Sequence, residues 1–407
     1  MQRCDVAVVG AGPAGAVTAL CLARAGARVA LVDKRYFPRE KACGDLIGPR
    51  GVRLLTDLGV TPPGARRVGD MIVIAPNGSR ALLPALPGVD YAGHALAITR
   101  QRFDAALVDA ALTAGAAMIH DRVVGVDGKR VRLSSGGDVT ADLIVGADGA
   151  MSRVAEAAGM VDEGRALWGF ALRSYVDAPV ELPYIVLWEP RRWELFPGYG
   201  WVFPTADGGA NVGLGLAVGA HRQDARRAAA HFGEFLQHAA RERLLPIGGA
   251  RERLGGWLKM GAIGTDPARG NVLLVGDAAG LINPLQGEGI AQAMASGRAA
   301  AAAIVAGPAG AAERYRAALF AMTGHHRVNA PVQVGMITHP VTVSVVARLL
   351  TAPLVRNAVA GAWSLYWNDL ASGAVPSRHR TLAEYVGRLV GAATRRRGSR
   401  LDLVARS

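Results

Sequence analysis

The chain has 407 residues, 51% of them hydrophobic and 19% charged, a composition that excludes a disordered chain and a collagen-like repeat. Its formal net charge is +13, and its basic residues are almost all arginines, since lysine occurs only at Lys34, Lys41, Lys129 and Lys259. The three cysteines lie near the N-terminus without a C-x-x-C pair, so the sequence predicts no disulfide framework, no iron–sulfur cluster and no metal site. It contains no module of basic and aromatic residues for nucleic acid, and no nucleic-acid partner is expected.

The N-terminal segment has the pattern of a strand, a glycine turn, a helix and a second strand. Residues 5–9 form a short β-branched run, residues 10–15 read GAGPAG, and residues 16–25 follow a helical pattern. The second strand, residues 28–32, ends at Asp33, where an acidic side chain can accept hydrogen bonds from ribose hydroxyls. These elements in this order predict a dinucleotide-binding site.

The glycines of this turn have separate roles in such a site. Gly10 permits a tight turn, Gly12 lets the backbone approach a pyrophosphate, and Gly15 lets the helix pack closely on the strand. The phosphates then lie at the free N–H groups of the helix N-terminus, where the helix dipole is positive.

Two later segments repeat the pattern of strand and glycine turn. Residues 142–154 read DLIVGADGAMSRV, with Asp148 in the turn, and residues 271–290 read NVLLVGDAAGLINPLQGEGI, with Asp277 at the end of the strand. Three such units are more than NAD binding requires. The chain here resembles the FAD-dependent class that includes para-hydroxybenzoate hydroxylase. That resemblance implies that Asp277 contacts the ribityl and pyrophosphate groups and that residues 287–289 face the flavin ring.

Two further segments narrow the family. Residues 199–215 read YGWVFPTADGGANVGLG, which resembles the signature of the geranylgeranyl reductase family. Residues 37–50 read FPREKACGDLIGPR, which resembles the Lys-x-Cys-Gly segment of that family, most closely its menaquinone-reductase branch. The resemblance extends from residue 5 to about residue 330. The chain departs from the pattern at Asp45, where many relatives have glycine, and at Asp33, where glutamate is usual.

The resemblance implies an α/β fold: a Rossmann-like FAD-binding domain of the para-hydroxybenzoate hydroxylase type, with an inserted antiparallel-sheet substrate domain and a C-terminal helical segment. The predicted FAD-binding domain is discontinuous, and the alternating apolar and polar pattern of the inserted pieces predicts the substrate sheet. The predicted limits are 1–64, 95–165 and 262–305 for the FAD-binding domain, 65–94 and 166–261 for the substrate domain, and 306–407 for the C-terminal region.

The resemblance also implies a reaction, in which reduced flavin delivers a hydride to a C=C bond of a prenyl chain. Such a reaction requires an apolar channel over the flavin, and aromatic residues concentrate around the signature segment. The predicted catalytic residues are Cys43, expected to be a partly accessible thiol of lowered pKa beside the flavin, and Tyr199 and Trp201, expected to line the channel. The alternatives are an inert buried thiol and ordinary core packing of the two rings.

The remaining predicted site residues hold the cofactor. Arg100 matches a family arginine that contacts FAD, with a solvated arginine at a helix start as the alternative, and Val124 is expected to give backbone contacts to adenine. The full predicted cofactor-binding set is Gly10, Gly12, Ala14, Gly15, Asp33, Lys34, Lys41, Gly44, Arg100, Val124, Asp148, Asp277, Gly287, Gly289 and Ile290.

The C-terminal region leaves two alternatives open. Residues 331–370 are strongly apolar, and residues 388–407 contain six arginines and one aspartate. This region either caps the substrate channel or contacts an anionic membrane surface, or else it packs on the body as a helical pair with a disordered tail. No signal peptide or spanning helix is predicted, so we expect a cytoplasmic protein, with peripheral contact at the inner face of the membrane under the first alternative.

The sequence therefore predicts an FAD-dependent reductase that saturates C=C bonds of a geranylgeranyl or menaquinone-type lipid. The expected electron donor is NAD(P)H or another reductant, which includes a separate electron-donor protein. The alternative is an FAD-dependent monooxygenase or epoxidase acting on a natural product. A halogenase is a weaker alternative, because it requires an active-site lysine and none lies between Lys41 and Lys129.

Overall fold

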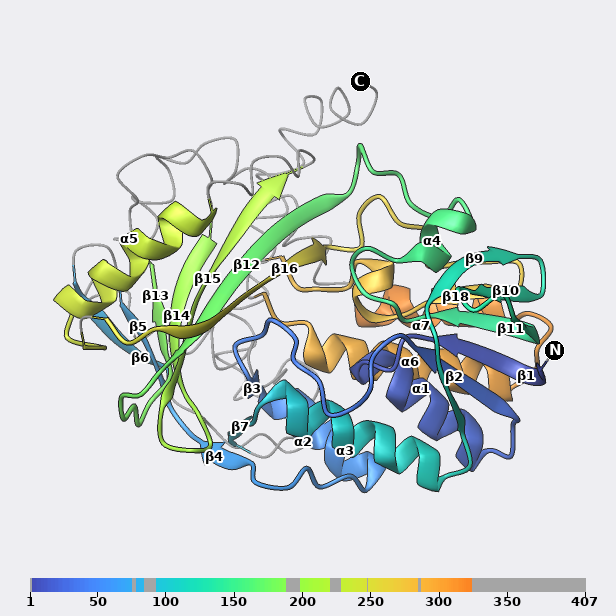
Figure 1. The fold of residues 1–407 in the computed structure, drawn as a ribbon, viewed down its shortest axis with the longest axis horizontal. Helices are drawn as coiled ribbons and strands as arrows, with labels where there is room; N and C mark the ends of the chain where they lie inside the picture. Colours follow the sequence, from blue (N-terminus) through green and yellow to red (C-terminus); the bar gives the residue numbers. More distant parts are fainter. Residues whose placement is uncertain are drawn as a thin grey trace, which may run out of the picture.

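A computed structural model describes residues 2–74, 78–83, 93–187, 198–219, 228–246, 248–284 and 287–323. These residues form two large sheets with helices around them, and a small third sheet (Figure 1). The α/β architecture agrees with the predicted fold class.

The first large sheet is built on the N-terminal strand. β1 (Gln2–Val9) pairs in parallel with β2 (Val29–Asp33) and β11 (Asp138–Gly146), and β8 (Ala117–His120) and β18 (Val272–Leu274) continue the parallel order on either side. These strands are rich in buried valine, isoleucine and leucine, as expected where helices cover both faces of a sheet. The short strands β17 (Ala268–Arg269), β9 (Val123–Asp127) and β10 (Arg130–Leu133) complete it.

Small residues let the helices of this half pack closely. α1 (Pro13–Arg24) begins with proline directly after Gly12, a favoured first residue because its missing N–H would have no partner there. It packs against α6 (Ile290–Val305), where a Cβ at Gly297 would lie 2.4 Å from the Ala14 carbonyl oxygen. The other helices of this half are α2 (Pro49–Leu58), α3 (Arg100–Thr113), α4 (Arg153–Ala157) and α7 (Ala311–Met322).

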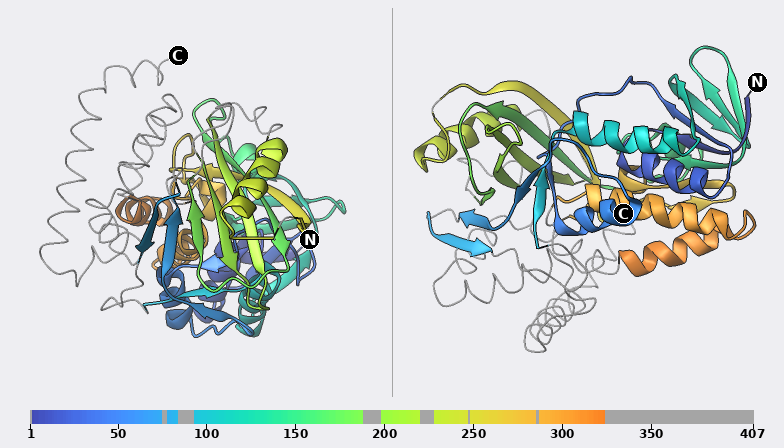
Figure 2. Two further views of the ribbon diagram at one scale, coloured as in Figure 1. Left: turned by 90° about the vertical axis from the view of Figure 1, so that its left-hand side faces the viewer. Right: turned by 90° about the horizontal axis from the view of Figure 1, so that it is seen from below.

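The second large sheet is mainly antiparallel. Its strands, in spatial order, are β16 (Arg251–Met260), β12 (Leu167–Val176), β15 (Ala210–Gly219), β14 (Gly198–Pro204), β13 (Tyr184–Val186), β5 (Met71–Ile74) and β6 (Arg80–Leu83). α5 (Ala228–Arg241) lies on one face, where the buried Phe235 ring occupies the space that a Cβ at Gly200 would fill. Figure 2 shows this sheet beside the half that contains β1.

A small sheet connects the two halves along the chain. β3 (Leu46–Ile47), β7 (Ala95–Ala97) and β4 (Arg66–Val68) form it, with β7 in the middle. The strands of the antiparallel sheet come from residues 71–83 and 167–260, within the predicted pieces of the substrate domain. The domain limits themselves stay a prediction.

Some sequence predictions lie outside the described residues. These are the apolar segment 331–370, the arginine-rich segment 388–407, and the aromatic residues Trp188, Trp193 and Phe196. Among the helices that the structure does describe, none is both long enough and apolar enough to cross a membrane.

Candidate FAD site and substrate site

The glycine turn after β1 lies in a crowded interior position. A Cβ at Gly10, whose φ is +100°, would lie 2.4 Å from the Ala147 carbonyl oxygen, and a Cβ at Gly15 would lie 1.8 Å from the Gly10 carbonyl oxygen. Gly12 is the N-cap of α1, and no side-chain hydrogen bond caps the N-terminus of this helix. This end of the sheet fits the pyrophosphate of a dinucleotide.

Asp33 lies at the end of β2, next to this turn. Its Oδ2 accepts a 2.7 Å hydrogen bond from the Ala11 amide and its Oδ1 one of 2.8 Å from the Arg35 amide. The carboxylate is thereby held at the edge of the glycine turn, where the sequence predicted a ribose partner. Lys34 follows with an exposed side chain.

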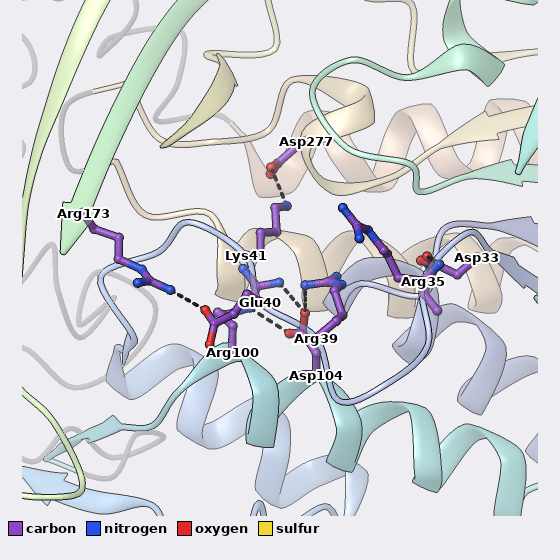
Figure 3. Close-up of polar contacts among 10 residues, drawn as sticks. Asp33, Arg35, Arg39, Glu40, Lys41, Arg100, Asp104, Arg173 and Asp277 are labelled. Atoms are coloured by element: carbon purple, nitrogen blue, oxygen red, sulfur yellow. Dashed lines mark hydrogen bonds and ion pairs between the residues drawn. The ribbon is translucent and has the colours of Figure 1, made fainter. Parts of the chain in front are cut away.

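Arg39, Arg100 and Asp104 form a cluster of buried ion pairs beside the glycine turn (Figure 3). Arg100, at the start of α3, donates two hydrogen bonds of 2.8 and 2.7 Å to the two carboxylate oxygens of Asp104. Arg39 Nη1 lies 2.7 Å from Oδ2 of the same carboxylate, and burial lowers the pKa of Arg39. Arg39 also lies beside the turn, with its Nη2 3.6 Å from where a Cβ at Gly12 would be. Arg100 is 5% exposed, so the alternative of a solvated arginine is wrong.

The loop of residues 34–45 joins the two halves across the site. Lys41 Nζ lies 3.4 Å from Asp277 Oδ2, and Glu40 pairs with Arg173 of β12 (Figure 3). Arg173 is almost fully buried and also donates a 2.8 Å hydrogen bond to the Glu252 carbonyl. Ion pairs therefore connect the loop to the antiparallel sheet on one side and to the dinucleotide-binding half on the other.

The two acidic turn residues differ in their surroundings. Asp148 accepts hydrogen bonds from the Ser152 hydroxyl at 2.5 Å and from the Arg153 amide at 2.6 Å, so its carboxylate caps α4. Burial raises the pKa of Asp148, whose backbone lies beside Gly10. Asp277 has no such local donors among the hydrogen bonds of the described residues, and it lies between Lys41 and the turn before α6, with its Oδ1 3.6 Å from a Cβ built at Gly289.

The aromatic side chains of β14 reach the glycine turn before α6. The Tyr199 hydroxyl oxygen would lie 2.9 Å from a Cβ built at Gly287, and burial raises the pKa of Tyr199. The Tyr199 and Trp201 rings meet edge to face with centroids 6.2 Å apart, and Trp201 stacks on Phe203 at the same separation. A layer of three aromatic rings thus extends from this turn along β14.

Cys43 and Gly44 lie against this aromatic layer. A Cβ at Gly44 would lie 3.0 Å from Phe203 Cε2, so Gly44 packs tightly against the ring. Burial raises the pKa of Cys43, although the nearby positive charge of Arg100 opposes it. The expected lowered pKa of this thiol is therefore wrong, because desolvation outweighs the nearby positive charge, whereas the residue is partly exposed, as expected.

The structure thus brings most of the predicted site residues to one region, between the ends of β1 and β2, the 34–45 loop, β14 and the turn before α6. Ile290 is the first residue of α6 in that region. Val124 is placed elsewhere, on β9 of the β9–β10 pair, with an exposed side chain. Its proposed backbone contact to adenine stays a prediction, as do the individual roles of the other residues.

Five residues of the site were not predicted from the sequence: Arg39, Tyr175, Arg173, Asn211 and Lys259. Lys259 is 1% exposed, and burial lowers its pKa to about 8, while Asp148, Asp277 and Glu163 oppose the shift. Its signal in the sequence is that it is one of very few lysines among many arginines. Asn211 lies inside the 199–215 signature, two residues before the first glycine of its Gly-x-Gly. No group of acidic, histidine or cysteine side chains suited to a metal ion occurs within the described residues.

Comparison with known proteins identifies a matching family model and similar sequences. A family model for an FAD binding domain matches residues 3–181. The chain is 34% identical over 320 residues to a menaquinone reductase of Mycolicibacterium smegmatis, across 75% of this chain and 77% of that protein. It is 31% identical over 314 residues to digeranylgeranylglycerophospholipid reductase 2 of Methanopyrus kandleri, across 73% of this chain and 75% of that protein.

Solved structures share the fold. A geranylgeranyl bacteriochlorophyll reductase-like protein of Thermoplasma acidophilum superposes with a TM-score of 0.71 at 21% identity, covering 91% of this chain and all of that one. A flavin-dependent brominase gives a TM-score of 0.69 at 18% identity, covering 95% of this chain and all of that one. At these identities the two neighbours establish the fold alone.

Proposed function

The chain belongs to the family of FAD-dependent reductases that includes the menaquinone and digeranylgeranylglycerophospholipid reductases, and from that premise we propose that it reduces C=C bonds in the prenyl chain of a lipid. A menaquinone-type lipid is the first candidate substrate, because a menaquinone reductase has 34% identity to this chain. The observation that carries the proposal is the contact of Tyr199, from the antiparallel sheet, with the glycine turn at Gly287. It places an aromatic, water-poor wall against the FAD-binding half.

The residues of the dinucleotide half fit FAD. The N-terminus of α1 would hold the pyrophosphate, Asp33 the adenosine ribose, and Asp277 with Lys41 the ribityl region. Bound and reduced FAD supplies a hydride. In this proposal the described residues contribute orientation of the substrate and exclusion of water.

The substrate side is shaped by the signature segment. Tyr199, Trp201 and Phe203 form the apolar layer, and Trp201 is locked by a 2.9 Å hydrogen bond from its Nε1 to Asn211 Oδ1. A fixed aromatic surface orients an isoprene unit at low entropic cost, because rigid rings lose little freedom on binding. The Cys43 thiol lies at the edge of this layer, and burial keeps it in the neutral form.

We further propose that the electrons come from NAD(P)H or from a separate electron-donor protein, and that the C-terminal region brings the enzyme to the membrane surface where a prenyl lipid resides. The net charge of +13 supports the second part, because a basic protein is attracted to anionic headgroups. Sedimentation with vesicles of anionic and of neutral lipids tests that part. Equal sedimentation with both would contradict it.

The function is tested without oxygen. The purified protein, loaded with FAD and reduced chemically, is mixed anaerobically with a menaquinone, and flavin absorbance is followed. The proposal predicts that menaquinone gains two hydrogen atoms in its side chain as the flavin is reoxidised, whereas a quinone of the same ring and a fully saturated side chain, which accepts electrons only at the ring, gains none there. A flavin that stays reduced until oxygen is admitted would instead support a monooxygenase.

A further inference from the structure

Asp45 is a buried carboxylic acid in a backbone conformation that favours glycine. The residue is 3% exposed, and its φ of 56° lies in the left-handed region. Two donors of the antiparallel sheet bind the same oxygen, Oδ2: the Tyr175 hydroxyl group at 2.5 Å and the Asn211 amide at 2.9 Å. The other oxygen, Oδ1, is shielded from water and has no hydrogen-bond partner among the residues that the structure describes.

The two oxygens therefore differ in what they can do. Oδ2 is occupied by donors, so a proton on Asp45 resides on Oδ1. In the ionised form Oδ1 is a buried charged acceptor without a partner, which is unfavourable. In the protonated form the same oxygen carries an O–H group that faces no protein acceptor in the described part of the chain. A proton held in this way has no competing protein acceptor among the described residues.

Burial is the largest influence on this carboxyl group. Two hydrogen-bond donors, Tyr175 and Asn211, face this carboxyl group from neighbouring elements. The guanidinium groups of Arg173 and Arg100 also lie near it. The remaining titratable neighbours are the Cys43 thiol and Glu40, which is paired with Arg173. The two donors and the two guanidinium groups favour the ionised form, but burial outweighs them and raises the pKa of Asp45 to about 6. Part of the population is thus protonated near neutral pH.

Asp45 is joined to the aromatic layer through a single residue. Asn211 donates to the Asp45 carboxylate and, at 2.9 Å, to the Cys43 carbonyl, and its own carbonyl accepts the hydrogen bond from Trp201. Gly44, between Cys43 and Asp45, lies against Trp201 and Phe203. The carboxyl group is therefore connected through Asn211 to the aromatic layer of the proposed substrate site.

We propose that Asp45 is the proton donor of the reduction and that Tyr175 positions it. This inference rests on the proposed function, since adding a hydride to one carbon of a C=C bond requires a proton at the other carbon. The π bond breaks and two C–H bonds form. The reduced cofactor gives one hydrogen with both electrons, and the Asp45 O–H bond gives the other as a proton, leaving its electron pair on the carboxylate.

Tyr175 fixes the orientation of the Asp45 carboxyl group. Its ring is half-buried, beneath the Arg173 guanidinium carbon at 4.2 Å, and its hydroxyl group donates to Asp45 Oδ2. This hydrogen bond occupies Oδ2 and leaves Oδ1 as the oxygen that carries the proton.

The test uses single turnovers of the chemically reduced, FAD-loaded protein with menaquinone, across pH 5 to 9. In the wild type the rate is highest below a pH of about 6, and above it the rate falls about tenfold per pH unit as Asp45 ionises. Asp45→Asn lowers the rate at low pH by on the order of 10²–10⁴-fold and removes this dependence. Tyr175→Phe keeps the ring beneath Arg173 but deletes a hydrogen bond that lowers the pKa of Asp45. The midpoint of the pH–rate profile should therefore move to higher pH, and the rate above pH 7 should increase.

A second readout does not depend on substrate. Infrared spectra of the protein without substrate should show a protonated carboxyl band that titrates near pH 6 and is missing in Asp45→Asn. Full activity of Asp45→Asn with an unchanged pH profile would overturn the assignment while leaving the proposed function in place. No midpoint shift in Tyr175→Phe, or no titrating band, would also overturn it. A wild type that never reoxidises with menaquinone would overturn both proposals.

Discussion

The indole ring of Trp201 lies directly over Gly213 on the neighbouring strand. The two residues are register partners of β14 and β15, and a Cβ at Gly213 would lie 2.0 Å from Trp201 Cζ2. At Gly215, two residues further along β15, a Cβ would lie 3.8 Å from the same ring, an ordinary contact distance. The first glycine of the Gly-x-Gly pair therefore makes room for the tryptophan of the same signature, and the second does not.

Replacing these two glycines separates their roles. Gly213→Ala should displace Trp201, break its hydrogen bond to Asn211 and cost about 1–3 kcal/mol of unfolding free energy, as overpacking does. Gly215→Ala should have a much smaller effect. Tryptophan fluorescence and urea unfolding of both variants measure this difference, and equal losses in both would contradict the packing account.

The dinucleotide turn allows a matched test of FAD binding. Gly15→Ala places a methyl group 1.8 Å from the Gly10 carbonyl oxygen, so the turn must open and FAD should no longer be retained on purification. The control is Gly69→Ala, where a Cβ meets no atom within 4 Å. Flavin absorbance per protein should be near wild type in the control. Retention of FAD by Gly15→Ala would show that the turn does not hold the cofactor.

Two arginine–aspartate pairs with the same i,i+4 spacing allow the stabilising effects of a buried and an exposed ion pair to be compared. Asp104→Asn leaves the guanidinium groups of Arg100 and Arg39 buried without a counter-charge, which should cost about 3–5 kcal/mol. Asp57→Asn breaks the solvated pair with Arg53 and should cost no more than about 1 kcal/mol. Urea denaturation of the two variants gives both values. Similar values for the two would mean that the Arg100 cluster is as solvated as the surface pair.

The lowered pKa of Lys259 predicts that the free energy of unfolding depends on pH in the alkaline range. Its folded-state pKa of about 8 is below the unfolded value, so between pH 8 and 10.5 the unfolded chain binds the extra proton. Stability therefore rises with pH across that window, by up to about 1.4 kcal/mol per pH unit from this group, and the penalty is fully developed below pH 8. Lys259→Met should remove this part of the slope, whereas replacement of the exposed Lys129 by Met should retain it. A slope in Lys259→Met equal to that of the wild type would contradict the burial of the ammonium group.

The Cys43 thiol should be a poor nucleophile in the folded protein. Burial raises its pKa, so alkylation by iodoacetamide at pH 7.5 should be at least about tenfold slower than in the urea-unfolded chain. Peptide mass mapping assigns the modified cysteine, and the buried Cys4 serves as a protected internal reference. Faster alkylation of Cys43 in the folded protein would instead reveal an activated thiolate.

Local patterns account for the parts of the fold and the site that the sequence predicted. The glycine turn, Asp33, Asp277 and the aromatic signature each depend on residues close together in the chain, and the structure brings these segments together at one edge of the parallel sheet. Periodicity alone predicts the strands of the second half. That these strands form an inserted antiparallel sheet was predicted from the family resemblance.

Long-range burial accounts for what was missed. The hydrogen bond between Asn211 and Asp45 joins residues 166 positions apart, and the one between Tyr175 and Asp45 joins residues 130 apart. No local pattern identifies such partners. The Cys43 pKa was predicted in the wrong direction for the same reason, because desolvation of the thiol arises from residues distant in the sequence that pack around it.

The central claim is that this chain adds hydrogen to a C=C bond of a prenyl lipid. Its most direct test is the mass of the lipid recovered after incubation of the reduced, FAD-loaded protein with menaquinone, in parallel without and with oxygen. The account predicts a gain of two hydrogen atoms per reduced bond in the anaerobic sample, located in the side chain by fragmentation. An unchanged lipid without oxygen, together with a gain of one oxygen atom in its presence, would contradict it.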